Sequence, residues 1–293
     1  MRIHDAASRQ NFQGTFVVSG GGSVSSARIA HFCEGTNEFE RSETLDGQAR
    51  HVFRYNDVVT TVWPASKSAL VEERDPIAQF PALLQGGDDH LFDFYDVRRQ
   101  GIERVAGRDA DVLAVRPRDA HRYGWRLWAD RSTGLLLRAE VIGEHNEVLE
   151  TSAFSDVAIG VKPHPETVMQ PLKKLDGYRI RRPALVSTRL AAEGWEMRRP
   201  APGFREVRCV KRPMDDAEVP PPVLQSIFSD GLTHVSVFIE PFDPRRHTRA
   251  LHAAVGPTQT LMQQQGDWWV TVVGDVPPAT LRIFAKGLAR LRP

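Results

Sequence analysis

Turn signals recur about every 8–12 residues along residues 1–160, and this spacing constrains the fold more than any other feature of the chain. Asp46-Gly47 is a strong hairpin signal because both residues tolerate a positive φ. Between the turns lie short segments rich in β-branched and aromatic residues, such as His51–Tyr55 and Val58–Trp63. The pattern predicts about eleven strands in an antiparallel meander, so the expected fold class is mainly β.

A single long antiparallel sheet must bury one of its faces. It can do so by curling into a barrel, closed or partly open, whose mouth is covered by a helix. The stretch Pro76–Leu84 has apolar residues at helical spacing and is followed by Gly86-Gly87, so we expect it to form that plugging helix. A partly open barrel of this size would enclose an apolar cavity that suits a lipid-like ligand.

The rest of the 293 residues differs in character. Residues 161–193 are rich in proline and carry Lys173-Lys174 and Arg181-Arg182, so we interpret them as a linker. Residues 194–293 mix strands with a final helix that begins at Pro277-Pro278, which predicts a smaller α+β domain. We therefore expect a large domain over 1–160, a linker over 161–193 and a small domain over 194–293.

Charge is unevenly distributed between the two halves. Residues 161–293 hold 20 basic and 13 acidic side chains, whereas residues 1–160 hold 18 basic and 24 acidic ones. The basic half could meet an acidic partner, or it could be the solvated surface of a domain with a different composition. The two cysteines, Cys33 and Cys209, fall in different predicted domains. In an oxidising compartment they could form a disulfide, and otherwise they are two thiols.

No arrangement of residues in the sequence indicates catalysis. The chain has no Gly-x-Ser-x-Gly elbow and no His-Glu-x-x-His motif, and Gly20-Gly21-Gly22-Ser23 lacks the lysine of a phosphate-binding loop. His31 and Cys33 share a face of a predicted strand, but nothing nearby would orient them as a catalytic pair. Basic residues are not interleaved with aromatic ones as nucleic-acid binding requires. We expect no enzyme activity, no cofactor or metal, and no nucleic-acid partner.

Several stretches resemble one known family, the RseB/MucB regulators of envelope stress. The similar stretches follow one another in order along nearly the whole chain. They are Asn11–Val17, Leu45-Asp46-Gly47, Tyr123–Leu137, Phe154–Gly160, Phe228–Leu232, Val235–Glu240 and Val270–Pro278. The most specific is the pair Phe228–Leu232 and Val235–Glu240 in the predicted small domain.

The resemblance implies a fold and a function that spacing alone does not show. In that family the large domain is an unclosed barrel similar to the lipoprotein carrier LolA. The small domain helps bind the periplasmic region of a membrane-spanning anti-sigma factor of the RseA/MucA type and shields it from site-1 proteolysis. The resemblance further implies that lipid or lipopolysaccharide signals bind the large domain and release the anti-sigma factor. The protein would then be a negative regulator of the sigma-E (AlgU-type) stress response.

The family is exported, so the resemblance implies a periplasmic location. The sequence has no apolar run of about 18 residues that could span a membrane, and Met1–Asp5 leads directly into folded-looking sequence with no signal peptide. A cytoplasmic protein, or an exported one shown without its leader, would begin in this way. The alternative function is a periplasmic lipid or lipoprotein carrier of the LolA type, although a carrier needs only the first domain. The sequence leaves open whether copies of the chain form a homo-oligomer.

Candidate binding residues follow from these expectations. Large apolar residues near the presumed plug are the candidates for lining a lipid cavity, namely Phe53, Trp63, Leu83, Leu84, Trp125 and Leu136. The hairpin of the small domain and its basic helix supply the candidates for contacting the anti-sigma factor, namely Phe228, Asp230, Leu232, Arg282, Lys286 and Arg290. Trp125 and Trp128 differ by three positions, so on a regular strand they face opposite sides of the sheet. A slip of one residue in strand register would exchange the cavity side for the exterior.

Overall fold

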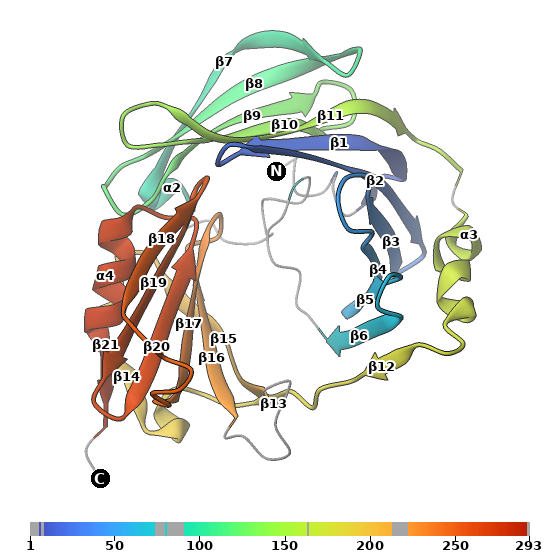
Figure 1. Ribbon diagram of the computed structural model, residues 1–293. Coiled ribbons are helices and arrows are strands. Elements are labelled where there is room, and N and C mark those ends of the chain that lie inside the picture. The colour runs from blue at the N-terminus through green and yellow to red at the C-terminus, as the bar shows by residue number, and fades with distance from the viewer. Residues whose placement is uncertain are drawn as a thin grey trace.

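Two sheets make up most of the molecule. The computed structural model describes residues 6, 9–73, 80, 91–162, 164–212 and 222–291. Within them a large N-terminal sheet arches over the top and right of the view, and a smaller C-terminal sheet with one helix stands at the left (Figure 1). The prediction of a mainly β fold with a smaller α+β part is confirmed.

The large sheet has 12 strands and is not closed. All neighbours pair antiparallel except β12 and β6, which are parallel. From one edge to the other the strands are β12 (Arg179–Arg181), β6 (Ser68–Glu73), β5 (Val58–Trp63), β4 (His51–Tyr55), β3 (Asn37–Thr44), β2 (Ser23–Glu34), β1 (Phe12–Gly20), β11 (Val148–Ile159), β10 (Leu136–Ile142), β9 (Gly124–Asp130), β8 (Arg108–Pro117) and β7 (Tyr95–Val105). Because β7 and β12 do not pair with each other among the described residues, the sheet is an open arch.

Strand β1 joins the two halves of this sheet. It pairs with β2 on one side and with β11 on the other. The two backbones approach closely at Gly14, where an added Cβ atom would lie 2.3 Å from the carbonyl oxygen of Asp156. The register of β1 against β11 shifts directly afterwards, between Thr15 and Phe16. A side chain at this position would collide with the backbone of β11, so glycine favours the close pairing of the two strands.

The turn between β9 and β10 is held by one carboxylate. Asp130 Oδ1 accepts hydrogen bonds from the backbone N–H groups of Ser132 (3.1 Å) and Thr133 (2.8 Å) and from both of their hydroxyls. Its Oδ2 accepts a bond of 2.7 Å from Arg108 Nε. Gly134 then takes a φ of 83°, which favours glycine. Burial alone would raise the pKa of Asp130, but the hydrogen bonds from Arg108, Ser132 and Thr133 outweigh burial and lower it.

The segment predicted as a linker carries ordered structure. It contains α3 (Pro165–Met169), the 3-10 turns η1 (Gln170–Lys174) and η2 (Ala191–Glu193), and two short strands. Strand β12 extends the large sheet, and β13 (Val186–Ser187) extends the small one by pairing with β15 (Arg205–Arg212). The connection thus adds a strand to each sheet. The division into 1–160, 161–193 and 194–293 stays a prediction.

The small sheet is covered on one face by a helix. Its strands, in spatial order, are β13, β15, β16 (Val223–Ser229), β17 (His234–Pro241), β20 (Trp268–Gly274), β19 (Thr258–Gln265) and β18 (Leu251–Val255). Helix α4 (Pro278–Gly287) buries Leu281 and Phe284 completely against this sheet. Each such side chain contributes roughly 1.5–3 kcal/mol on burial. Beside α4, β14 (Trp195–Met197) pairs with β21 (Leu288–Arg290).

Three further observations concern the described residues only. None of their helices is long and apolar enough to cross a membrane. They contain no group of side chains that could hold a metal ion. Cys33 and Cys209 are not joined by a disulfide. Burial raises the pKa of the Cys209 thiol to about 12, with the carboxylate of Glu206 adding to the shift, so this thiol stays protonated at neutral pH.

Candidate functional site: a cavity between two domains

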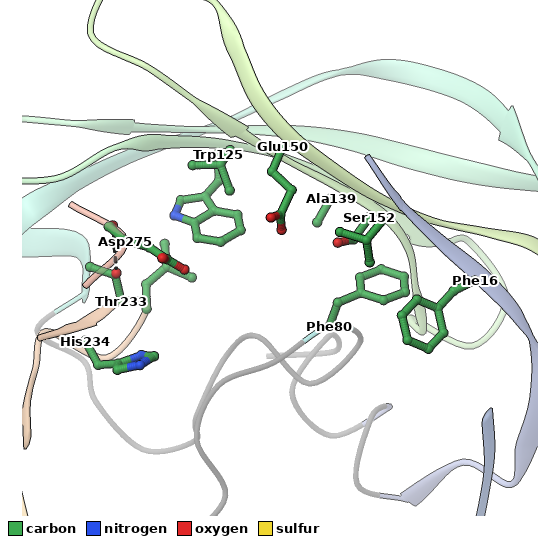
Figure 2. A pocket seen from close by; sticks show the side chains of 12 residues that line it. Phe16, Phe80, Trp125, Ala139, Glu150, Ser152, Thr233, His234 and Asp275 are labelled. Atoms are coloured by element: carbon green, nitrogen blue, oxygen red, sulfur yellow. Dashed lines mark hydrogen bonds between the residues drawn. The ribbon is translucent and has the colours of Figure 1, made fainter. Parts of the chain in front are cut away.

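A cavity of about 240 Å³ lies between the two sheets (Figure 2). The large sheet supplies one wall through residues of β1, β9, β10 and β11, and the small sheet supplies the other through His234 of β17 and residues next to β17 and β20. The lining residues are Phe16, Val18, Phe80, Trp125, Ala139, Val141, Glu150, Ser152, Leu232, Thr233, His234 and Asp275. Neither domain forms this cavity alone.

The part of the wall that belongs to the large domain is mainly apolar. Trp125 on β9 is 9% exposed, and register places it beside Val141 of β10 on the same face of the sheet. Phe80 contacts the rings of Phe16 and Phe154, with centroids 5.8 Å and 5.3 Å apart. The aromatic side chains therefore form a surface that suits an apolar chain rather than a polar metabolite.

Titratable groups from both domains face the same cavity. Burial raises the pKa of Glu150, and the carboxylate of Asp275 raises it further. Burial lowers the pKa of His234 despite the nearby carboxylates of Asp275 and Asp230. Asp275 Oδ1 accepts a bond of 2.6 Å from the Thr258 hydroxyl. The polar part of the wall therefore favours neutral forms of Glu150 and His234.

Beside the cavity, a buried ion pair joins the two domains. Arg122 Nη1 of the large domain donates to Asp230 Oδ2 of the small domain over 2.8 Å, and both side chains are 0% exposed. The same oxygen accepts a bond of 2.9 Å from the hydroxyl of Tyr95. Burial and the Asp230 carboxylate raise the pKa of Tyr95 well above its usual range, so it remains a donor.

The other nitrogen atoms of the Arg122 guanidinium also donate hydrogen bonds. Its Nε and Nη2 donate to the two carboxylate oxygens of Asp119, each over 3.1 Å, and Nη2 also donates to the carbonyl of Pro202. The guanidinium lies over the rings of Phe94 and Phe204, at 4.6 Å and 5.2 Å from their centroids. A buried pair with this many partners holds the domains in one relative orientation.

One loop of the small domain supplies both the carboxylate of the ion pair and part of the cavity wall. Asp230 Oδ1 accepts hydrogen bonds from the backbone N–H groups of Leu232 (3.0 Å) and Thr233 (2.8 Å). Leu232 and Thr233 in turn line the cavity, and Leu232 packs into the core of the large domain. A ligand that displaces these two residues would therefore act directly on the carboxylate that joins the domains.

The domains also meet away from the cavity. At the far edge of the sheets, Arg212 Nη2 donates to Glu72 over 3.0 Å, and Arg208 Nη2 donates to the carbonyl of Glu73 over 3.0 Å. The turn between β1 and β2 also meets the turn between β18 and β19, because an added Cβ atom at Gly21 would lie 2.7 Å from the backbone nitrogen of Gly256. The large sheet thus contacts the small one near its β12–β6 edge and again at the β1–β2 turn.

The structure places the six predicted lipid-binding residues in different surroundings. Trp125 lines the cavity. Leu136 is buried in the core near it but is not in its wall, and Trp63 is half-buried at the end of β5. Phe53 packs with Val62 against Leu172 and Leu175, beneath the connection that was predicted to be a linker. Leu83 and Leu84, like the predicted helix Pro76–Leu84 apart from Phe80, lie outside the described residues.

The structure also places the predicted partner-binding residues in different parts of the molecule. Phe228 is in the core of the small domain, where its ring meets that of Phe284. Asp230 and Leu232 are buried at the domain interface described above. Arg282 and Lys286 are exposed on α4. Arg290 lies on β21 rather than on the helix, and its guanidinium lies over the rings of Trp195 and Trp268.

Most residues of the cavity wall were missed by the sequence reasoning. Ala139 and Val141 could have been found, because the predicted hairpin of β9 and β10 puts them on the same face as Trp125. The residues from the small domain carry no such signal. His234 and Asp275 reach the cavity only because the domains are packed together, and the pattern of a single strand does not contain that information.

Comparisons with known proteins agree with this architecture. Residues 1–173 match the family model of the MucB/RseB N-terminal domain, and residues 189–289 match that of the MucB/RseB C-terminal domain. The chain is 33% identical to the sigma factor AlgU regulatory protein MucB of Pseudomonas aeruginosa, over 98% of this chain and 88% of that protein. It is 24% identical to the sigma-E factor regulatory protein RseB of Escherichia coli K12, over 97% of this chain and 87% of that protein.

Solved structures extend the likeness to three dimensions. The crystal structure of MucB in complex with the periplasmic part of MucA superposes with a TM-score of 0.73 at 31% identity, over 100% of this chain and 97% of that one. A further crystal structure of MucB superposes with a TM-score of 0.71 at 29% identity, over 99% of this chain and 95% of that one.

Proposed function

This chain belongs to the MucB/RseB family, and from that premise we propose that it is a periplasmic regulator that binds the periplasmic region of a membrane anti-sigma factor. The observation that carries the proposal is the likeness, along the whole chain, to MucB solved with the periplasmic part of MucA. The names of its relatives, which regulate AlgU or sigma-E, support the regulatory role. They also argue against an enzyme.

Binding would protect the anti-sigma factor from site-1 proteolysis by covering its cleavage segment. The exposed basic side chains Arg282 and Lys286 are one helical turn apart on α4, so both can meet one acidic stretch of a partner. At the domain interface, Glu72 and Asp230 are already paired with Arg212 and Arg122 of the same chain. The outer face of α4 is therefore our candidate for part of the contact surface.

Release would follow from occupation of the cavity by a lipid chain. A cavity of about 240 Å³ lies slightly below the roughly 300–1,000 Å³ of sites for whole small molecules, so it would take part of an acyl chain. Four buried methylenes contribute roughly 3 kcal/mol, which matches the roughly 1–3 kcal/mol typical of coupling between sites. The loop of Leu232 and Thr233 would pass this energy to Asp230 and so to the domain orientation.

A carrier of the LolA type remains the second candidate for the large domain. A carrier would need only one domain to hold its cargo. In this chain Leu232, Thr233, His234 and Asp275 of the small domain complete the cavity, which argues for a regulator in which the two domains act together.

The test is direct binding. The full chain would be titrated by calorimetry with the periplasmic region of the anti-sigma factor that accompanies it in its own organism. We expect a saturable complex that is weakened about tenfold by Arg282→Glu with Lys286→Glu. The control is Arg245→Glu, which reverses the charge of an exposed arginine far from α4 in sequence. This variant should leave the affinity for the anti-sigma region unchanged. Absence of a complex with the unaltered chain would contradict the proposal.

A further inference from the structure

A second pocket, of about 500 Å³, lies next to the domain interface at the ends of three strands. It is formed where β8 ends at Pro117, β9 begins at Gly124 and β10 ends at Ile142. Arg116, Arg118, Arg122 and Arg126 all lie along its wall, so we call it the arginine pocket. It has no place in the anti-sigma contact proposed above.

Two of the four arginines form ion pairs with carboxylates that the structure describes, and the other two do not. Arg122 is committed to Asp230 and Asp119, and Arg126 Nη1 pairs with Glu140 over 3.1 Å. Arg116 and Arg118 are exposed and form no ion pair with any residue that the structure describes. Two positive charges therefore remain available at one side of the pocket.

The neighbouring carboxylates do not neutralise these two arginines. Both oxygens of Asp119 accept from Arg122. Asp96 lies opposite Arg116 in the pairing of β7 with β8, but its carboxylate accepts a bond of 2.6 Å from Arg98 Nε. Glu144, exposed in the loop after β10, is the opposing carboxylate in the described part of the wall that no arginine engages. The wall therefore carries an excess of positive charge.

Part of the remaining wall is apolar and adjoins the interdomain cavity. Val115, Pro117 and Ile142 provide apolar surface beside the arginines. Trp125 lines both the arginine pocket and the cavity between the domains. A molecule with an anionic head and an apolar chain thus meets, at this shared residue, both the arginines of one pocket and the aromatic part of the other.

We propose that the arginine pocket binds a phosphate monoester group, with Arg116 and Arg118 as its ligands. A doubly charged phosphate matches two unpaired guanidinium groups, each of which can donate two parallel hydrogen bonds to it. The phosphate is the head of an amphiphile whose chain lies against Trp125. This assignment names the class of lipid and rests on the lipid-binding part of the proposed function.

The test compares three probes that separate the head from the chain. They are inorganic phosphate, dihexanoyl phosphatidic acid and dihexanoylglycerol, which has the same chains without the phosphate. Each is titrated calorimetrically into the full chain, below the concentration at which the lipids form micelles. We expect phosphatidic acid to bind about tenfold more tightly than dihexanoylglycerol, because charge-assisted hydrogen bonds to phosphate are among the strong ones.

Variants assign the difference to the pocket. Arg116→Gln with Arg118→Gln should reduce the affinity for phosphatidic acid to that for dihexanoylglycerol and leave the latter unchanged. Glu144→Gln should tighten phosphatidic acid binding, because it removes the opposing charge. The matched control, Arg245→Gln with Arg249→Gln, removes two exposed arginines outside the pocket and should change neither affinity.

The outcomes separate the two proposals. If phosphatidic acid binds as tightly to the Arg116/Arg118 variant as to the unaltered chain, the arginine pocket is not the phosphate site, whatever the fate of the lipid-binding proposal. If neither lipid binds but inorganic phosphate does, and the variant loses it, the phosphate site stands and lipid binding fails. If none of the probes binds, both are overturned.

Discussion

At the scale of single residues, the feature that dominates this molecule is the carboxylate of Asp230. It accepts four hydrogen bonds, from Tyr95 and Arg122 of one domain and from the backbone of Leu232 and Thr233 of its own. A charge without exposure to solvent is tolerated only when it is paired and fully hydrogen-bonded. Asp230 therefore holds the two domains together through a bond network that cannot be removed in part without cost.

We expect Asp230→Ala to lower the free energy of unfolding by about 3–5 kcal/mol, because the buried Arg122 then loses the fully buried one of its two carboxylate partners. Arg122→Met combined with Asp230→Leu should recover much of this loss, since no buried charge is then left alone. Chemical denaturation of Arg122→Met, of Asp230→Leu and of the variant that carries both measures the coupling. Strictly additive losses would show that the pair does not act as a unit.

At the same scale, we expect Asp130 to determine part of the loss of stability at low pH. The pKa of Asp130 is lowered in the folded protein, so its carboxylate stabilises the fold above the unfolded pKa of about 3.9, and this contribution is lost as the pH falls below that value. Asp130→Asn should lower the free energy of unfolding at pH 7 by about 2–3 kcal/mol and flatten the decline between about pH 5 and pH 2. Denaturation curves across this range measure it. A variant with the same acid sensitivity as the unaltered protein would contradict the assignment.

At the scale of elements, β1 is the strand on which the large sheet depends. Gly14→Ala forces a Cβ atom against the backbone of Asp156, and a backbone atom cannot move away as a flexible side chain can. We expect a loss of about 1–3 kcal/mol in the free energy of unfolding. Amide hydrogen exchange should be faster in β1 and β11 than elsewhere in the sheet.

Gly124→Ala is the matched control for this prediction. Gly124 also lies in a strand of the same sheet, but an added Cβ atom there would meet its nearest neighbours at 3.4 Å. This is an ordinary contact distance, so the variant should unfold at nearly the same denaturant concentration as the unaltered protein. Equal effects of the two substitutions would show that the close approach at Gly14 has no special cost.

The elements also show how far sequence reasoning reaches. The meander was predictable because its turns contain residues that take a positive φ, such as Asn56 and Gly134. The pairing of β12 with β6 was not, because it joins Arg179–Arg181 to Ser68–Leu70 across more than a hundred residues. A proline-rich segment resembles a linker in sequence whether or not a distant edge strand is available to pair with it.

Because sequence patterns do not reveal contacts between distant segments, they predict some residues of the site and miss others. Trp125 could be proposed for the cavity because it is a large apolar residue on a predicted strand. The sequence makes Asp230 a candidate contact for the anti-sigma factor, since a short motif with Ser, Asp and Gly is typical of an exposed turn. Only the position of Arg122 in the other domain makes it an interior residue. Contacts between domains are not encoded in the periodicity of either one.

At the scale of the whole molecule, the two sheets share one cavity and are joined by contacts on either side of it. The loop Asp230–Thr233 contributes to the cavity wall and to the ion pair, so the state of the cavity and the orientation of the domains are physically linked. We propose that this linkage converts the binding of a lipid into a change of affinity for the anti-sigma factor. The coupling needs only a few kcal/mol, which a short buried chain can supply.

The central claim is that the cavity controls partner affinity. The variant that tests it is Ala139→Phe, which places a ring in the cavity wall, and its control is Ala254→Phe on the exposed edge strand β18. The most direct measurement is the calorimetric affinity of the full chain for its anti-sigma periplasmic region, with and without saturating dihexanoyl phosphatidic acid. Lipid should weaken the complex about tenfold in the unaltered chain and in Ala254→Phe, and should have no effect in Ala139→Phe. The account would be contradicted if lipid did not change the affinity of the unaltered chain for its partner. It would also be contradicted if lipid lowered the affinity of Ala139→Phe as much as that of the unaltered chain.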